Sequence, residues 1–142
     1  MNNIEKYMSD MQFLGSSIKN LEINNDFVVF PDKSNKMFDV VYERILINKR
    51  DERKNGTIRL DVKVTLSENE RNCNFHLVIE GCFSISSKVS DDDFEKILAL
   101  NGRASLYSVA RAYITTISSI TFAGGSIVLP MMNFVKANED NQ

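Results

Sequence analysis

An alternation of apolar and polar residues over positions 56–66 is the strongest pattern in the chain. The apolar positions are Ile58, Leu60, Val62, Val64 and Leu66. Because successive side chains of a strand point to opposite faces, this period predicts a strand with one buried and one solvated face. Residues 73–86 repeat the alternation, and the polar turn 67–72 between the two segments predicts an antiparallel hairpin.

Two more strands are predicted towards the N-terminus. Residues 37–49 are rich in Val, Ile, Phe and Tyr, and their apolar positions change parity between Tyr42 and Ile45, which predicts a β-bulge. The charged run 49–56, which ends in Asn-Gly, predicts the hairpin tip before the next strand. Residues 11–23 predict the first strand, and a loop over 24–36 connects it to the second.

The pattern changes to a helical period in the second half of the chain. Ser90 precedes three acidic residues, as is typical of a helix N-cap, and Asn101 and Gly102 predict the end of that helix. A second helix is predicted over 105–122, where apolar residues recur every three or four positions, with the glycine pair 124–125 as its C-terminal cap. The elements predict an α+β fold, a four-stranded antiparallel sheet followed by two helices.

We expect a single domain over residues 1–142, with short polar ends at 1–10 and 136–142. The 17 Lys and Arg residues are balanced by 19 Asp and Glu, and a chain that depends on nucleic-acid phosphates is usually distinctly basic. We therefore expect no nucleic-acid partner. The uncharged run 112–135 is long enough to span a bilayer, but six Ser or Thr residues, two glycines and a proline interrupt it. We therefore expect no membrane span.

Composition also argues against catalysis. The chain has one histidine and two cysteines, which argues against a zinc site and against a His-based triad. It has no nucleophile elbow and no Gly-rich phosphate loop before a helix. We expect no enzyme, no catalytic residue, no metal and no cofactor. Cys73 and Cys82 lie nine positions apart on one predicted strand, so they face opposite sides and cannot pair; free thiols and the lack of a signal peptide predict a cytoplasmic location.

Three short motifs carry a resemblance to a known family. They are the segment 81–87 (Gly-Cys-Phe-Ser-Ile-Ser-Ser), the segment 106–115 (Leu-Tyr-Ser-Val-Ala-Arg-Ala-Tyr-Ile-Thr), and Phe122 with Leu-Pro-Met-Met-Asn-Phe at 129–134. In this order and at these separations, over residues 11–135, the chain resembles the SecB family of protein-export chaperones. The resemblance implies a SecB-like fold assembled as a homotetramer, a dimer of dimers, without a cofactor. It also implies that unfolded or nascent polypeptides, such as preproteins, bind in apolar grooves.

The chain departs from that family at one functional surface. The family's acidic residues on the first and fourth strands contact the SecA motor, and the corresponding positions here are Asn20, Asn24, His76 and Val78. The acidic patch is therefore missing, which puts coupling to SecA in doubt. Three interpretations stay open: an ATP-independent holdase for export, a SecB-like chaperone of an antitoxin, and a non-catalytic structural or interaction domain.

Two sets of residues are predicted to carry the binding functions. Residues 27–31 are apolar although they lie in a predicted loop, where no strand or helix period requires buried side chains. An apolar loop of this kind usually packs against another surface. The predicted client contacts are Phe27, Val29, Phe30, Phe75, Leu77, Met131, Met132 and Phe134, with ordinary core packing as the alternative for each. The predicted oligomer contacts are Ser108, Arg111, Ala112, Thr115 and Ser119, with an ion pair to a nearby acid as the alternative for Arg111.

Overall fold

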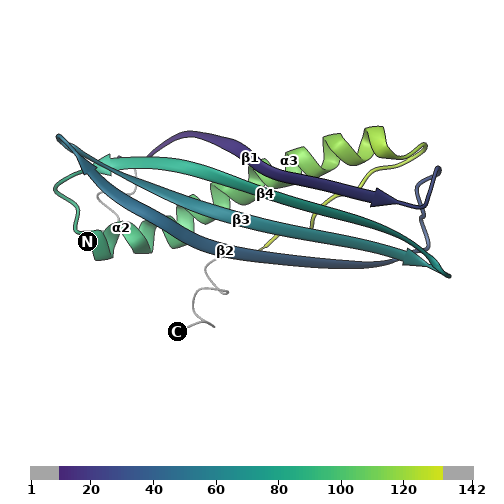
Figure 1. The fold of residues 1–142 in the computed structure, drawn as a ribbon. Helices are drawn as coiled ribbons and strands as arrows, with labels where there is room; N and C mark the ends of the chain where they lie inside the picture. The colour runs from purple at the N-terminus through teal and green to yellow at the C-terminus, as the bar shows by residue number, and fades with distance from the viewer. Residues whose placement is uncertain (1–9, 133–142) are drawn as a thin grey trace.

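A four-stranded antiparallel sheet forms one layer of the molecule, and a helical layer covers one of its faces (Figure 1). The computed structural model describes residues 10–132. The strands are β1 (Gln12–Asn25), β2 (Asn35–Arg50), β3 (Arg53–Glu68) and β4 (Arg71–Ser86). Their spatial order is β1-β4-β3-β2, so the first two strands form opposite edges of the sheet. The connection 26–34 between them therefore crosses over one end of the sheet.

The alternation predicted for β3 and β4 is confirmed, and it creates the core. Leu60 lies opposite Ile79, and Val62 lies opposite Leu77, so the inward side chains of the two strands form one continuous apolar surface. All four are fully buried. The opposite face of the two strands is polar, with residues such as Arg59 at the positions between. The predicted bulge in β2 is also confirmed, at the register shift between Arg44 and Leu46.

The hairpin tip before β3 is shorter than the sequence predicts. Arg50 pairs with Arg53, so the tip consists of two residues, not of the run 49–56. Asp51 has a φ of 55°, a left-handed conformation that Asp tolerates better than most residues. Gly56 belongs to β3, and a Cβ there would lie 2.7 Å from Leu98 Cδ1. This glycine lets the helical layer approach the sheet; it does not make the turn.

The two predicted helices are present, but the boundary between them is not where the sequence placed it. Ser90 caps α2 (Asp91–Ile97) by accepting a hydrogen bond from Asp93 N at 3.1 Å. A π-helical turn, η1 (Leu98–Gly102), then joins α2 directly to α3 (Arg103–Thr121). Gly102 has helical φ and ψ of −66° and −44°, so it does not end the helix. A Cβ on Gly102 would lie 3.2 Å from Leu98 Cδ2 and 3.5 Å from Ile58 Cδ1, which shows why glycine stands where helix and sheet meet.

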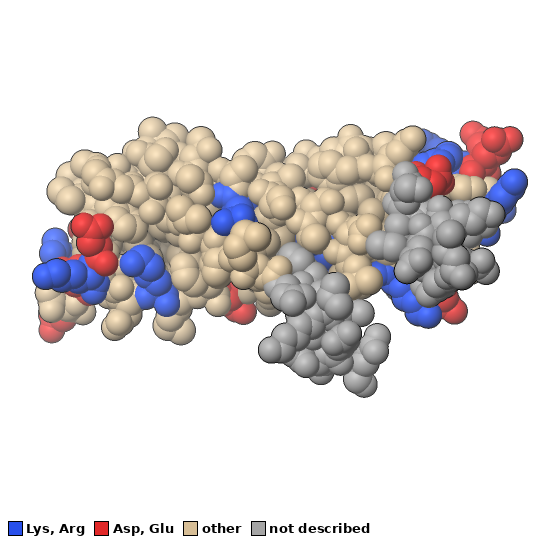
Figure 2. All heavy atoms as spheres, turned by 180° about the vertical axis from the view of Figure 1, so that it is seen from behind, with Lys and Arg blue, Asp and Glu red and all other residues tan. Residues whose placement is uncertain are grey.

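The helix α3 runs obliquely across the sheet, and the segment that follows it turns back along the same face (Figure 1). The buried side of α3 carries Leu106, Ala110 and Ile114, which pack against β3 and β4. Within the described range, none of the helices has the length and apolar character needed to cross a membrane. Viewed from the helix-bearing side, charged residues gather at the two ends of the molecule, and the middle of this face is mostly uncharged (Figure 2).

Candidate functional site

The crossover connection between β1 and β2 lies beside the segment that follows α3. Phe30 N donates to Ala123 O at 2.9 Å, and Ala123 N donates to Val28 O at 2.8 Å. These bonds form an isolated parallel bridge between Val29 and Ala123. Two segments almost 100 residues apart in sequence are thus held together at the end of the sheet, and both segments carry predicted client contacts.

Three phenylalanine rings pack together at this junction. The Phe30 ring meets Phe122 edge-on, with centroids 5.5 Å apart, and Phe122 lies tilted against Phe75 with centroids 6.1 Å apart. Phe75, on β4, is fully buried, and so is its neighbour Leu77. The predicted floor of a client groove is therefore covered in this structure by the helix end and the crossover connection, as the core-packing alternative expected.

The sequence predicted Phe27 as a client contact on the surface. In the structure the Phe27 side chain is only 6% exposed. Asn25 closes a tight turn around it, since Phe27 N donates to Asn25 Oδ1 at 2.9 Å and Asn25 Nδ2 donates to Phe27 O at 2.7 Å. The Arg71 guanidinium lies 5.1 Å from the centroid of the Phe27 ring. The turn directs this side chain inward, so Phe27 belongs to the core.

The other predicted client contacts divide between exposed and half-buried positions. Val29 is 65% exposed and Met131 is 81% exposed, whereas Phe30 and Met132 are half-buried. Phe134 lies outside the described residues. Met131 and Met132 border a small hollow beside Ala104 and Tyr107, near the start of α3, whereas Phe30 contacts Phe122 just beyond its end. The predicted walls therefore do not face each other across one groove; they lie at opposite ends of α3.

The segment 127–132 connects those two ends and runs antiparallel to α3. Thr115 Oγ1 donates to Ile127 O at 3.1 Å, and Arg111 Nε donates to Leu129 O at 2.9 Å. Tyr107, one helical turn earlier, donates its hydroxyl to Pro130 O. Three side chains of α3 thus hold the main chain of this segment.

Two of these three contacts involve residues that the sequence assigned to an oligomer interface. Arg111 and Thr115 are half-buried against the segment 127–132, and among residues 10–132 Arg111 contacts no carboxylate. Ser108, Ala112 and Ser119 are exposed on α3. An open hollow of about 400 Å³ adjoins this side of the helix and is lined by Ser108, Arg111, Ala112, Thr115 and Thr116. The five predicted interface residues therefore have two different surroundings.

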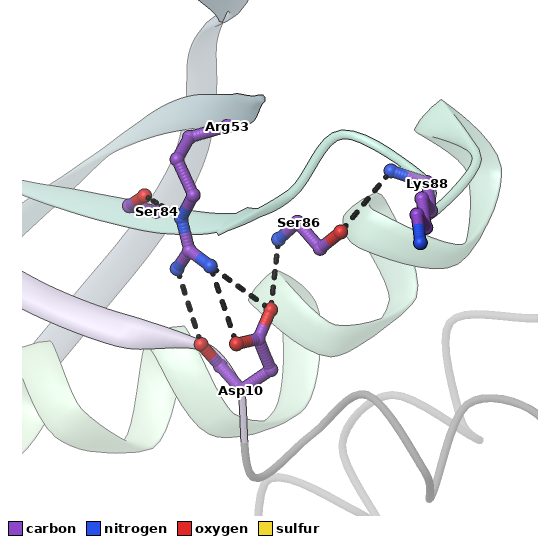
Figure 3. Close-up of polar contacts among 5 residues, drawn as sticks. All are labelled: Asp10, Arg53, Ser84, Ser86 and Lys88. Carbon is purple, nitrogen blue, oxygen red and sulfur yellow. Dashed lines mark hydrogen bonds and ion pairs between the residues drawn. The ribbon is translucent and has the colours of Figure 1, made fainter. Parts of the chain in front are cut away.

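A second hollow of about 400 Å³ lies at the opposite end of the sheet from the crossover connection. Asp10 and Arg53 are among the residues that line it, and Figure 3 shows the polar contacts between them and their neighbours. Arg53 Nη1 donates to both carboxylate oxygens of Asp10, at 3.2 and 3.1 Å, and Arg53 Nε donates to Ser84 Oγ at 3.0 Å. Ser86 N donates to Asp10 Oδ2 at 2.9 Å. The guanidinium is thus engaged within the protein, and the cluster anchors the start of β1 to β3 and β4.

The titratable residues show structural roles. His76 Nε2 lies 2.9 Å from Asp61 Oδ1, and its Nδ1 lies 4.0 Å from Glu22 Oε2, so the imidazole links three neighbouring strands. Cys73 and Cys82 are both free, and burial raises the pKa of the Cys73 thiol to about 11, with a smaller contribution from the Asp26 carboxylate. Among residues 10–132, His, Cys, Asp and Glu nowhere form a group of three that could hold a metal ion.

Comparison with models of known protein families and with curated proteins finds no match. Among solved structures, the chain is similar to the SecB-like chaperone Rv1957 of Mycobacterium tuberculosis, in complex with a ChAD peptide from the Rv1956 HigA1 antitoxin. The TM-score is 0.62 at 11% identity, and the match covers 93% of this chain and 98% of that one. A protein of unknown function from Streptococcus agalactiae is also similar, with a TM-score of 0.48, 14% identity, and coverage of 85% and 97%. The likeness to Rv1957 confirms the SecB-like fold predicted from the sequence.

Proposed function

We propose that this protein is a non-catalytic holdase chaperone that binds unfolded polypeptides without ATP. The observation that carries the proposal is a band of exposed apolar side chains on the two connections beside α3. We call it the apolar band, and its members are Val28, Val29, Val128 and Met131. Each large side chain left in water forgoes about 1.5–3 kcal/mol of burial free energy, so a row of exposed apolar side chains beside one helix suits an intermittent apolar partner.

The chemistry of the apolar band suits clients of varied sequence. The band follows α3 from near Phe122 back to Tyr107, and 15 residues of helix span about 22 Å at about 1.5 Å per residue. A client segment of about seven extended residues has that length. Methionine adapts to different partners because its side chain is unbranched and polarizable, which favours binding of apolar segments without sequence readout.

Two client classes remain, and we favour an antitoxin over an export preprotein. The positions that would contact SecA lie together on the outward face of β1 and β4, where Asn20 pairs with Val78 and Glu22 pairs with His76. None of the four corresponding positions, Asn20, Asn24, His76 and Val78, is acidic, although Glu22 lies opposite His76, and His76 is engaged with Asp61. An acidic docking surface for an export motor is therefore weak here. The antitoxin peptide bound to the SecB-like Rv1957 is consistent with the same assignment.

We also propose that the chain assembles in the cytoplasm as a homotetramer. Ser108, Ala112 and Ser119 leave one side of α3 free of bulky side chains, so a second helix can approach it closely. The edge strand β1 exposes large apolar residues, among them Leu14 and Ile18. It carries few charges that would prevent pairing with another strand. A purely structural domain would share these features, and the client assay below separates the two.

The test is suppression of aggregation of two unrelated, chemically unfolded proteins, followed by light scattering without ATP. We expect the wild-type protein to suppress aggregation of both at near-stoichiometric concentration. The double change Val28→Ser, Val29→Ser, on the crossover connection, should raise the required concentration several-fold. The matched control is Met37→Ser, Val41→Ser, which removes exposed apolar side chains of the edge strand β2. No suppression by the wild type, or an equal loss in the control, would refute the proposal.

A further inference from the structure

The segment 127–132, which we call the resident segment, lies on the molecule as a bound extended peptide would. Ile127 and Leu129 are 1% and 0% exposed, whereas Val128 between them is 59% exposed. This alternation of inward and outward side chains is typical of an extended chain that inserts every second residue into apolar sockets. The resident segment thus uses two aliphatic anchors two positions apart.

The donors that hold the resident segment contact its main chain. Thr115 and Arg111 are four residues apart on α3, so they are separated by about 6 Å along the helix axis. The carbonyls that they contact, those of Ile127 and Leu129, are two residues apart, which is about 6.6 Å in an extended chain. The row of helix donors therefore matches the repeat of an extended polypeptide. Because every polypeptide carries such carbonyls, this row selects an extended main chain and not a particular sequence.

The attachment is of a kind that can be released without breaking the sheet or the helix. Within the described range, the main-chain hydrogen bonds of residues 127, 129 and 130 go to side chains of α3, and none pairs them with a strand. Gly124, with a φ of +79° and no neighbour within 4 Å of a would-be Cβ, lies between the helix end and the resident segment, and glycine adopts this backbone conformation without strain. The sockets that hold Ile127 and Leu129 are part of the apolar core to which Phe75 and Phe122 also belong.

We propose that Tyr107, Arg111 and Thr115 form a binding site for an extended polypeptide, and that the resident segment is an internal competitor which a client displaces. The client class is an unfolded segment with large aliphatic residues at two positions separated by one residue. This inference rests on the proposed chaperone function, because it specifies where and how a client binds. It also gives a reason for the burial of Ile127 and Leu129: the site is filled by the chain itself when no client is present.

The proposal makes a prediction of unusual sign. When a binding-competent state is only partly populated, the apparent dissociation constant is the intrinsic one divided by the populated fraction. A change that weakens the resident segment should therefore tighten client binding, although it removes apolar surface from the protein. If the resident segment were instead a wall of the client groove, the same change would weaken binding.

The test uses the full chain and a fluorescein-labelled synthetic peptide with the sequence of residues 124–132, Gly-Gly-Ser-Ile-Val-Leu-Pro-Met-Met. We expect Leu129→Ala to bind this peptide about tenfold more tightly than the wild type, by fluorescence anisotropy. Ser126→Ala, in the same connection but outside the two sockets, should leave the affinity unchanged. Ile127→Val provides a milder variant with the same expected sign if Leu129→Ala does not fold. Unchanged or weaker binding in the folded variant would overturn the inference.

Two further measurements separate this inference from the chaperone function. An excess of the unlabelled peptide should displace an unfolded client, whereas a peptide with aspartate in place of both aliphatic anchors should not. The amide of Ile127, which donates to Ser118 Oγ at 2.7 Å, should lose protection from hydrogen exchange at saturating client. If the wild type binds no unfolded client, the chaperone function fails. If it binds clients while the peptide does not compete and the amide stays protected, only the resident-segment inference fails.

Discussion

The ring of Phe30 lies directly on the backbone of Gly125: a Cβ on this glycine would come within 2.6 Å of Phe30 Cγ. Phe30 comes from the crossover connection and Gly125 from the connection after α3, so one aromatic ring joins the two chain segments. The same ring meets Phe122 edge-on. The glycine that the sequence suggested as a helix cap thus has a packing function, because no other residue leaves room for the ring.

The change Gly125→Ala tests this packing. The added methyl group must push the Phe30 ring away from Phe122, and overpacking of this kind costs about 1–3 kcal/mol. We expect the free energy of unfolding, measured by urea denaturation, to fall by that amount. Ala123→Ser, an exposed position in the same connection, should change stability by less than about 0.5 kcal/mol. If Gly125→Ala lost as little stability as Ala123→Ser, the Phe30 ring would have adapted to the added methyl group without cost.

Phe27→Ala should behave as a core substitution. The side chain is buried and its turn is fixed by Asn25, so removal of the ring leaves a cavity, and such changes cost about 3–5 kcal/mol. Urea denaturation should show this loss, whereas Val28→Ala at the neighbouring exposed position should stay within about 0.5 kcal/mol. A stable Phe27→Ala protein with weakened client binding would instead return Phe27 to the client surface.

The sheet could be predicted from the sequence because its physics is local. A strand that buries one face must alternate, and β3 and β4 alternate without exception through their central pairs, as at Leu60 and Ile79. Glycine is ambiguous in the same reasoning. Gly102 was predicted to end a helix and Gly56 to close a turn, yet both serve a close approach between the helical layer and the sheet. The packing partner that decides between these roles is distant in sequence.

The candidate site was predictable only in part, for a related reason. The apolar excess of the two connections is visible in composition, and Val29 and Met131 are indeed exposed. The inward turn of Phe27 depends on Asn25, and the pairing of Arg111 and Thr115 with the segment after α3 depends on a chain reversal. A spacing of four residues on a helix places side chains on one side, but it does not say which segment will occupy that side.

The exposed side of α3 makes assembly testable. We expect the wild type to be a tetramer at micromolar concentration by multi-angle light scattering, and Ala112→Arg to form smaller species because a long charged side chain blocks close helix approach. Asn48→Arg, which adds the same side chain at an exposed position of β2, should leave the mass unchanged. A monomeric wild type, or a tetrameric Ala112→Arg protein, would contradict this assignment.

Cys73 gives the fold a pH dependence of defined sign. Burial raises the pKa of its thiol from 9.0 to about 11, so the folded protein keeps the proton over a range in which the unfolded chain loses it. The unfolded state then binds fewer protons, and stability falls as pH rises between about 9 and 11. Below pH 9 the thiol is protonated in both states and this contribution is constant. We expect a loss of roughly 1 kcal/mol per pH unit within that window.

The measurement is urea denaturation of the wild type and of Cys73→Ala at pH 8, 9, 10 and 11. Lysine and tyrosine side chains titrate in the same range, so the informative quantity is the difference in pH dependence between the two proteins. Cys73→Ala should show the shallower decline, because it lacks the thiol whose pKa is raised and retains every other titrating group. The Cys73 thiol should also resist alkylation at pH 8 until urea unfolds the chain, whereas the half-buried Cys82 serves as the reactive reference. Parallel pH profiles of the two proteins, together with rapid alkylation of folded Cys73, would show that the core does not enclose this thiol. The end of the sheet beside the crossover connection would then open to solvent.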